Sequence, residues 1–332
     1  MNLSEATAEG TDDSSFVSVI IVTFNSAAVI HAALTGARTH LPGAEIIVVD
    51  NGSTDDTCDL VTAFPGIRLI SGHGNVGFGA GVNVGARAAR GKILLVHNPD
   101  AVPTSVDRAA LSRLAETTPF GMVGCRLHES GHTQHSLHVA WGWRKELSWS
   151  LAEWYLVPRE VKSFRPRPRK HASTWVSGAA FLVDRDEFMR VGGFDERLFL
   201  YYEDFDLSRA YTSRGLPHRS TTSVTLKHMG RSSSPRNEDV MMAWALMSLI
   251  EQTAKWDGTA AAHTAARWAW RQLGVIETVG HSVGRIPWIG VRGRQKAASA
   301  ANVRAQLRRA ATVETTEVHY PVARAALRAQ MN

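Results

Sequence analysis

The chain has 332 residues, 44% hydrophobic and 20% charged, which is the composition of a globular protein with room for about two domains. We expect residues 1–15 to be a disordered polar tail rather than a signal peptide or anchor, and no apolar run is long enough to cross a membrane. The two cysteines, Cys58 and Cys125, lack metal-ligand spacing and fit a reducing compartment. The net charge is +6, and from Lys255 onward 12 Lys or Arg face 4 Asp or Glu, so the C-terminal part is the basic one.

Strand-like and helix-like segments alternate through the first hundred residues. Branched apolar runs predict strands at 16–23, 45–49, 67–70 and 93–96. Helices are expected at 27–37 and at 86–90. A further helix is expected directly after the turn at 50–56, with Ser53 or Thr54 as its N-cap. This alternation predicts βαβ units and a mostly parallel sheet. The loops that begin at Thr23, Asp50 and Asn98 would then meet at one sheet edge, where α/β proteins bind ligands.

Asp100 follows the fourth strand. Pro99 cannot donate to a sheet ladder, so the strand ends there and Asp100 enters the loop. A carboxylate at this edge suits a divalent cation and hence a nucleotide diphosphate. An alternative is that Asp100 caps a helix expected at 105–115.

Six glycines lie between Gly72 and Gly85, ahead of the helix expected at 86–90. The segment nearly matches a dinucleotide-binding fingerprint, but it does not follow the first strand as that fingerprint requires. Glycines at a helix start more simply allow the backbone to approach a phosphate or sugar closely. The histidine- and tryptophan-rich stretch at 128–154 is compatible with a metal cluster, although a carbohydrate-lining or packed surface fits its pattern better.

Three carboxylates, those of Glu203, Asp204 and Asp206, begin a helix that is expected to run to Arg214. Their mutual repulsion and the aromatic residues before them raise the pKa of at least one, which is a setting for a general base. Stabilisation of the helix dipole is the competing explanation, but it rarely needs three acids. His228 leaves a strand expected at 218–226 and is either a metal or phosphate ligand or a surface residue.

The C-terminal region predicts helices at 239–256 and 295–311, with Trp268, Trp270 and Trp288 set among arginines. Cationic helices with tryptophans suggest attachment to an anionic membrane surface, whereas packed helices with a solvated basic face would look the same. A nucleic-acid role is disfavoured because no nucleic-acid-binding module or stacking platform is present.

Together the motifs resemble the family 2 glycosyltransferases, in particular their bacterial rhamnosyltransferase branch. The resemblance covers about residues 16–234 and implies a GT-A fold, which is α/β and Rossmann-like, with a mostly parallel central sheet flanked by helices. We expect a catalytic domain at 16–234, with a nucleotide-sugar half at 16–101 and an acceptor half at 102–234, followed by a helical C-terminal region at 235–332. The motifs that carry the resemblance are Val17–Asn25, Val49–Asp56, Asn75–Gly79, Asn98–Ala101, Ser177–Ala180 and Gly192–Leu207.

The resemblance implies roles for individual residues. Asp204 matches the catalytic base, and Asp100 with His228 would hold Mg²⁺ or Mn²⁺, although Asn98 replaces the first carboxylate of the family's Asp-x-Asp motif. Ser177, Gly178, Glu203 and Asp206 are expected near the acceptor or the base. The residues expected to bind the nucleotide sugar are Thr23, Asn25, Asp50, Asn51, Asn75, Gly77, Phe78, Asn83, Asn98 and Asp100.

The function that this resemblance implies is inverting transfer of L-rhamnose from dTDP-L-rhamnose to a lipid-linked saccharide of the GlcNAc-diphospho-polyprenol type, in cell-wall or polysaccharide assembly. Another donor, such as UDP-galactofuranose or UDP-GlcNAc, is the main alternative, and a noncatalytic sugar-nucleotide binder is a further one. The expected partners are the donor, the lipid-linked acceptor and an anionic membrane. The expected location is the cytoplasm, peripheral to the inner face of the cell membrane.

Overall fold

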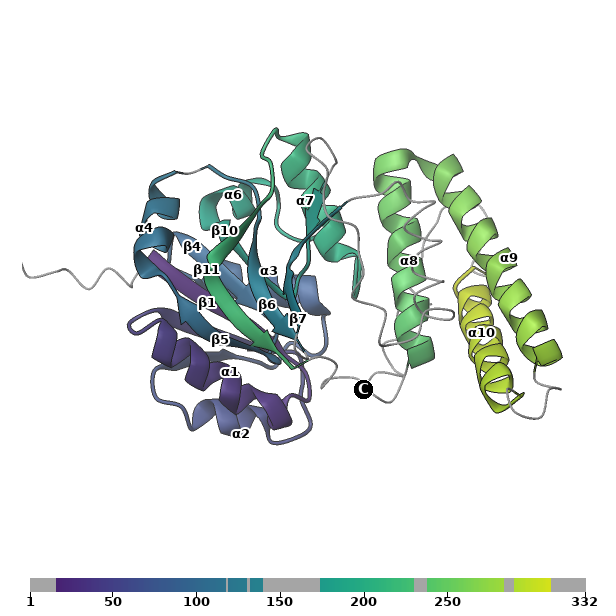
Figure 1. Cartoon of the computed structure of the whole chain (residues 1–332), viewed down its shortest axis with the longest axis horizontal. Coiled ribbons are helices and arrows are strands. Elements are labelled where there is room, and N and C mark those ends of the chain that lie inside the picture. Colours follow the sequence, from purple (N-terminus) through teal and green to yellow (C-terminus); the bar gives the residue numbers. More distant parts are fainter. Residues whose placement is uncertain are drawn as a thin grey trace, which may run out of the picture.

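The computed structural model describes residues 16–117, 119–129, 132–139, 174–229, 238–283 and 290–311. A twisted sheet with helices on both faces forms one side of the molecule, and three long helices, α8 to α10, stand beside it (Figure 1). The expected N-terminal tail and the tryptophans between 141 and 154 lie outside the described residues.

Nine strands of the described chain form the main sheet, in the order β3-β2-β1-β4-β10-β6-β11-β5, with β7 paired to β6. The first four strands pair in parallel, as the alternating pattern predicts, and later strands add antiparallel pairs. A separate ribbon joins β8 (Leu137–Val139) to β9 (Thr174–Val176). The strands of the main sheet are β1 (Val17–Thr23), β2 (Glu45–Asp50), β3 (Ile67–Ile70), β4 (Ile93–His97), β5 (Ala101–Val106), β6 (Val123–Glu129), β7 (His132–His135), β10 (Ala180–Asp184) and β11 (Arg219–His228).

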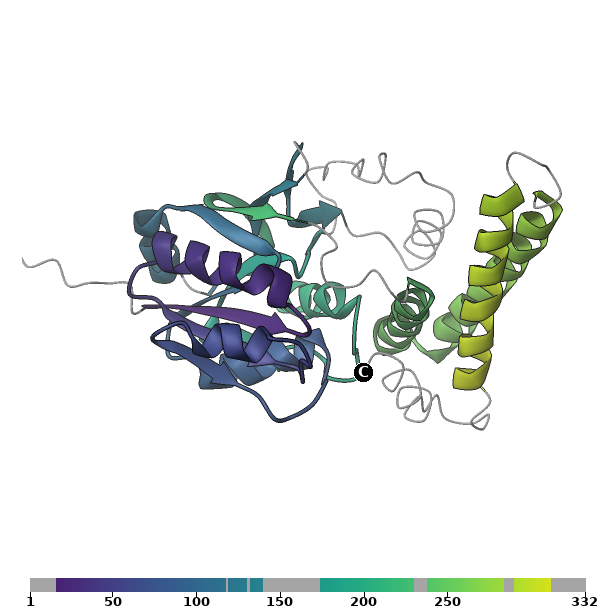
Figure 2. The same ribbon diagram turned by 90° about the horizontal axis from the view of Figure 1, so that it is seen from below.

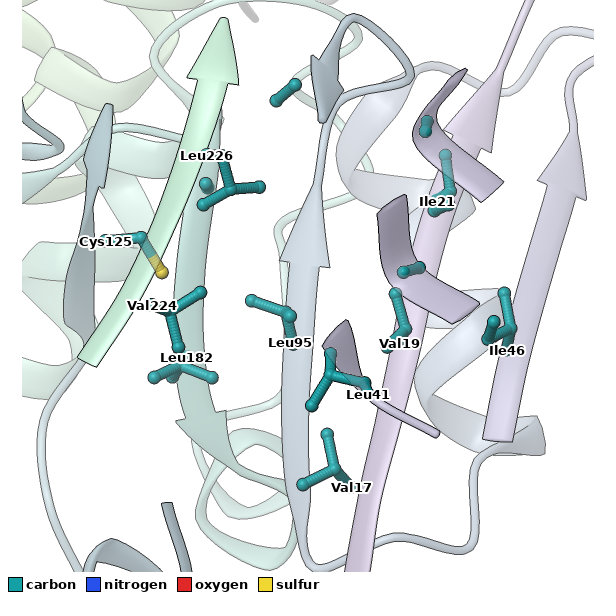
Figure 3. Packing of buried hydrophobic residues seen from close by; sticks show 14 of the residues in the cluster. Val17, Val19, Ile21, Leu41, Ile46, Leu95, Cys125, Leu182, Val224 and Leu226 are labelled. Atoms are coloured by element: carbon teal, nitrogen blue, oxygen red, sulfur yellow. The ribbon is translucent and has the colours of Figure 1, made fainter. Parts of the chain in front are cut away.

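The central strands are buried on both faces. Along β1, Val19 and Ile21 pack with Ile30 and Leu34 of α1 (Ala27–His40), while Ile20 and its alternate neighbours pack on the opposite face with α3 (Phe78–Ala88). Figure 3 shows the first of these faces, with the side chains of neighbouring strands directed to the same side. Two covered faces explain why these strands read as unbroken apolar runs.

The sheet curls at its β5 end. A Cβ atom at Gly36 of α1 would lie 2.7 Å from the carbonyl oxygen of Pro103, so β5 passes directly over α1. The register between β11 and β5 shifts at Thr225 and Leu226, and such an irregularity bends a strand locally.

Three expected boundaries were wrong. Residues 101–106 form strand β5, and the helix expected at 105–115 is α4 (Arg108–Glu116), whose cap is Asp107 and not Asp100. Helix α2 (Thr57–Thr62) begins after Asp56, and Ser53 is not its cap, because the Ser53 N–H donates to the Asp50 carboxylate instead. Helix α3 begins at Phe78 inside the glycine-rich segment, since close packing against β1 favours glycines such as Gly81 and Gly85.

The acidic cluster of Glu203, Asp204 and Asp206 forms the first turn of α7 (Glu203–Ser213), which follows α6 (Arg185–Arg190) in the chain. After it, α8 (Glu238–Asp257), α9 (Thr259–Val283) and α10 (Gly290–Ala311) share one apolar core that includes Trp244, Leu249 and Leu273. Helix α8 lies between α7 and the pair formed by α9 and α10 (Figure 2). Among the helices of the described residues, none combines the length and apolar content needed to span a bilayer.

Candidate active site

One edge of the sheet collects most of the predicted site residues. The parallel strands β1, β2 and β4 end there at Thr23, Asp50 and His97. Because β10 runs antiparallel to β4 and pairs Ala180 with His97, its first residues lie at the same edge. The pairing of His128 with Lys227 and of His228 with Ala101 brings the ends of β6 and β11 and the start of β5 to this edge as well.

Asp50 organises the loop after β2. Its buried carboxylate accepts hydrogen bonds from the Thr23 hydroxyl at 2.9 Å and from the backbone N–H groups of Gly52 and Ser53 at 3.0 and 2.9 Å. Burial alone would raise the pKa of Asp50, but these bonds, led by those of Ser53, lower it. The carboxylate is therefore ionised, and its oxygens are committed to shaping the loop.

Asn25 and Asn51 differ in accessibility. Asn25 is exposed in a left-handed conformation with φ 49°, and its side-chain oxygen accepts from the Thr54 N–H at 2.8 Å. Asn51 is buried, and its amide donates to the Gly77 carbonyl at 3.0 Å. The Asn51 amide oxygen lies 3.1 Å from Nε2 of His73. Asn51 thus ties the loop after β2 to the glycine-rich segment.

The glycine-rich segment meets the region of the predicted base. Gly77 has φ 92°, and a Cβ atom there would lie 2.3 Å from the carbonyl oxygen of Phe199. The Phe78 N–H donates to that same carbonyl at 3.2 Å, and Asn75 accepts from the Gly77 N–H at 3.3 Å. Only a glycine permits this approach, so the loop and the segment before α7 are fixed against each other.

Asn83 has a different environment from the other predicted donor residues. Its amide donates to the Phe194 carbonyl at 2.9 Å and to Glu196 at 3.1 Å, and its oxygen accepts from the Phe194 N–H at 2.9 Å. The side chain is 5% exposed and holds the turn after α6. Because its amide is used in this way, we leave Asn83 out of the proposed donor site.

Asp100 and His228 face each other. The Asp100 side chain is 6% exposed, and its Oδ1 lies 3.4 Å from Nε2 of His228, whose Nδ1 lies 3.6 Å from Glu129. Burial lowers the pKa of His228, but the hydrogen bond and charge of Asp100, together with Glu129, outweigh it and raise that pKa overall. Within the described ranges, no three His, Cys, Asp or Glu side chains form a metal cluster of their own.

Asp204 lies at the start of α7 and is half-buried. Its Oδ2 accepts from the Gly178 N–H at 2.8 Å, and its Oδ1 accepts from the Phe205 N–H at 2.8 Å. Gly178 has little space for a side chain, because a Cβ atom would lie 3.0 Å from the Phe78 ring. Ser177 precedes it, and the Ser177 hydroxyl lies 3.4 Å from the Ala179 N–H, which donates to it.

A short chain of hydrogen bonds connects Asp204 to the loop of Asp100. The Asn98 N–H donates to the Ala179 carbonyl at 3.0 Å, and the adjacent Gly178 N–H donates to Asp204. Asp100 follows Asn98 by two residues. The two acids predicted to serve one reaction therefore lie at the same edge of the sheet, on neighbouring segments.

The other two acids of the cluster are buried. Glu203 is 5% exposed, and burial, together with the charges of Asp204 and Asp206, raises its pKa well above the ordinary value. Asp206 accepts from Nζ of Lys255 at 2.7 Å and from Nε1 of Trp256 at 2.6 Å. Asp206 therefore anchors α8 to α7, and Asp204 is the most accessible acid of the three.

Three further residues at this edge were not predicted from the sequence. His73 contacts Asn51, and Glu129 contacts His228, but no local motif marks either residue. Burial lowers the pKa of His97 to about 4, so this ring is neutral and its Nδ1 donates to the Asn98 carbonyl at 2.9 Å. The position of His97 at the end of an apolar strand, directly before Asn98, was the one sequence signal that could have predicted it.

Comparisons with known proteins identify the family of the chain. The family model "Glycosyl transferase family 2" matches residues 18–184, which is half of the chain. An N-acetylglucosaminyl-diphospho-decaprenol L-rhamnosyltransferase from Mycobacterium tuberculosis is 32% identical over 185 residues, covering 49% of this chain and 59% of that protein. The rhamnosyltransferase WbbL from Escherichia coli is 28% identical over 176 residues, covering 49% of this chain and 64% of that protein. Each alignment thus spans less than two thirds of the relative's length.

The fold has solved counterparts. A crystal structure of GalNAc-T7 with UDP, GalNAc and Mn²⁺ is similar at a TM-score of 0.54 and 15% identity, covering 92% of this chain and 58% of that one. At this level of identity the likeness concerns the fold alone. The family match, the rhamnosyltransferase relatives and the mixed α/β architecture lead to one assignment: the chain belongs to glycosyltransferase family 2 and has a GT-A fold.

Proposed function

We propose that the protein transfers L-rhamnose from dTDP-L-rhamnose, with inversion, to a lipid-linked saccharide of the GlcNAc-diphospho-polyprenol type. The observation that carries the proposal is the common sheet edge of Asp100 and Asp204, joined through Asn98, Ala179 and Gly178. The rhamnosyltransferase relatives support the choice of sugar and acceptor. Such an enzyme would act in the assembly of a cell wall or surface polysaccharide.

Asp204 is the proposed catalytic base. The acceptor hydroxyl attacks the anomeric carbon, its proton moves to the Asp204 carboxylate, and the bond to the nucleotide diphosphate breaks as the new glycosidic bond forms. The Gly178 and Phe205 N–H groups, each 2.8 Å from a carboxylate oxygen, hold this side chain in one orientation. Glu203 is buried, and its raised pKa keeps it protonated to higher pH, so it is less available to take a proton from the acceptor.

The donor site is proposed along the ends of β1, β2 and β4. Asn25 is exposed at this edge, and Asp50 with Thr23 shapes the loop beside it. Gly77 and Phe78 bring the N-terminal end of α3 to the same side, and backbone N–H groups at a helix start favour a phosphate. Asn51 and Asn75 keep this segment in place.

Asp100 and His228 are the proposed ligands of a divalent cation. Their oxygen and nitrogen atoms are 3.4 Å apart, close to the roughly 3 Å between adjacent ligands of an ion with bonds of about 2.1 Å. A carboxylate with an imidazole suits Mn²⁺ at least as well as Mg²⁺. When bound, such a cation would stabilise the negative charge that develops on the departing diphosphate. Diphosphate oxygens would complete the ligand set, because this branch has Asn98 where a second carboxylate would stand.

Another nucleotide sugar, such as UDP-galactofuranose or UDP-GlcNAc, is the competing donor. A transfer assay with each of the three donors, a GlcNAc-diphospho-polyprenol acceptor and either Mg²⁺ or Mn²⁺ separates these possibilities. The proposal requires inverted rhamnosyl product with dTDP-L-rhamnose and at least tenfold less product with the others. Equal or greater transfer from a UDP-sugar contradicts the assigned donor, and a lack of transfer from all three would favour a noncatalytic binder.

We further propose that the C-terminal helices attach the enzyme to the anionic surface that holds its acceptor. His263, Arg267, Arg271, Val275 and Val279 are exposed along α9 at intervals of four residues, so successive members are neighbours on a stripe that winds slowly around the helix. The tryptophans are not part of this face: Trp268 is half-buried against the helical core, and Trp270 lies under the Arg304 guanidinium at 4.5 Å from the ring centre. Trp288 lies outside the described residues.

Vesicle sedimentation tests this attachment. Each arginine near an anionic surface contributes about 1 kcal/mol, so the double variant Arg267→Glu/Arg271→Glu is expected to reduce binding to phosphatidylserine vesicles by at least about thirtyfold. The matched control is Arg113→Glu/Arg219→Glu, which makes the same charge change at exposed positions of the sheet unit. Equal pelleting of the two double variants would contradict a membrane role for α9.

A further inference from the structure

The backbone of the segment directly before Asp204 is strained. Tyr201 and Tyr202, directly before α7, have φ values of 64° and 62°, in the left-handed region that side chains larger than glycine rarely adopt. Two such residues in sequence persist only where the surrounding structure holds them. The orientation of Asp204, two residues later, depends on this corner.

The sheet unit holds the segment from one side. The Phe199 carbonyl accepts from the Phe78 N–H at 3.2 Å, and Asp204 itself accepts from the Gly178 N–H at 2.8 Å. These contacts fix the two ends of the segment 199–204.

Helix α8 holds the same segment from the other side. The Trp244 ring packs on the Phe199 ring with centres 4.5 Å apart, and the Ser248 hydroxyl donates to the Leu200 carbonyl at 3.0 Å. Two turns further along, Trp256 donates to Asp206 at 2.6 Å. Positions 244, 248 and 256 are separated by multiples of four residues, so one face of α8 follows the chain from Phe199 to Asp206.

Ion pairs anchor the C-terminal end of α8. Lys255 lies 2.7 Å from Asp206 and 3.0 Å from Asp195, so it connects α8 both to α7 and to the turn before the strained corner. The Arg209 guanidinium lies 5.2 Å from the centre of the Trp256 ring and 2.9 Å from Asp257. The apolar, hydroxyl and ionic contacts of α8 thus lie on both sides of Tyr201 and Tyr202 in the sequence.

We propose that α8 is a positioning element for the catalytic base, and that Ser248 is a positioning residue that acts through the Leu200 carbonyl on the Tyr201–Tyr202 corner. The inference rests on the proposed function where it takes Asp204 as the base. It assigns to the C-terminal helical region a part in catalysis that is separate from any membrane attachment. Loss of the Ser248 hydroxyl should leave donor binding intact, because the glycine-rich segment contacts the Phe199 carbonyl, whereas Ser248 contacts the Leu200 carbonyl.

The test compares Ser248→Ala with Thr253→Val in the full-length protein. Both residues are buried on α8, but the Thr253 hydroxyl donates within the helix, to the Leu249 carbonyl at 2.7 Å. Because small displacements of a reacting group cost large factors in rate, we expect kcat to fall about tenfold in Ser248→Ala with an unchanged KM for the donor. Thr253→Val should retain the kcat of the unmodified protein.

Hydrogen–deuterium exchange supplies a second readout that needs no turnover. We expect the amides of residues 199–206 to exchange at least about fivefold faster in Ser248→Ala than in Thr253→Val. If the unmodified protein transfers sugar and the two variants match in kcat and in exchange, or lose both equally, the positioning role is refuted. If the unmodified protein transfers no sugar, the proposed function fails, and the exchange comparison still decides whether Ser248 holds the corner.

Discussion

Gly77→Ala is the substitution whose effect the structure specifies best. The new Cβ atom would lie 2.3 Å from the Phe199 carbonyl oxygen, and the backbone φ of 92° with ψ of 168° belongs to a region that is essentially restricted to glycine. The backbone conformation alone costs about 1–3 kcal/mol. Loss of the hydrogen bond from the Phe78 N–H to Phe199 adds about 1 kcal/mol.

Gly72→Ala is the matched control for this substitution. Gly72 lies in the same segment with φ 88°, and nothing lies within 4 Å of the Cβ atom that alanine would add. It therefore carries a conformational cost without the collision. We expect Gly77→Ala to reduce the free energy of unfolding by about 2–4 kcal/mol and to exceed the loss in Gly72→Ala by at least 1 kcal/mol.

Urea denaturation of the two variants, followed by circular dichroism, measures this difference. The midpoint should shift more for Gly77→Ala with an unchanged slope. Donor affinity should also fall in Gly77→Ala, because the start of α3 must move away from Phe199. Equal losses of stability in the two variants would show that the contact between the glycine-rich segment and the chain before α7 does not hold the site together.

Three further outcomes follow from the buried charges. Glu203 has a folded-state pKa above its ordinary value of 4.5, so the native state binds this proton more tightly, and the free energy of unfolding falls as the pH rises from about 5 toward that pKa. Glu203→Gln should therefore flatten the dependence of Tm on pH. An unchanged slope would contradict this reasoning. Lys255→Met leaves the buried Asp206 with one partner and should cost about 2 kcal/mol in urea denaturation, less than a fully buried pair because the lysine is 32% exposed; no loss would refute the anchor. Asp100→Asn should abolish the rise in Tm that Mn²⁺ with dTDP gives the unmodified protein, and a retained rise would remove Asp100 from the metal site.

The sequence predicted the sheet edge well because its signals are local. The apolar run at 93–96 with Pro99 after it marks the end of β4, and β4 is fully buried as that pattern requires. The parallel pairing of β1, β2 and β4 then brings Thr23, Asp50 and Asn98 together without any further information. The GT-A fold was implied by the resemblance of the motifs to those of the family 2 glycosyltransferases.

Other features depend on contacts between distant segments. Residues 101–106 form β5 because β11 pairs with them and α1 packs against them, and neither partner is visible in the local pattern that placed the start of a helix at residue 105. Asn83 resembled a donor-site residue, but the turn at 194–196 occupies its amide. Lys255 and Trp256 read as part of a basic tail, whereas the structure pairs both with Asp206.

The most direct test of the account is the rate of rhamnosyl transfer by Asp204→Asn, measured beside the dissociation constant of dTDP-L-rhamnose. General base catalysis contributes about 10² to 10⁴ in rate, so kcat should fall by at least about a hundredfold while the dissociation constant changes less than twofold. Transfer by Asp204→Asn at a rate close to that of the unmodified protein would contradict the claim that Asp204 takes the proton of the acceptor hydroxyl.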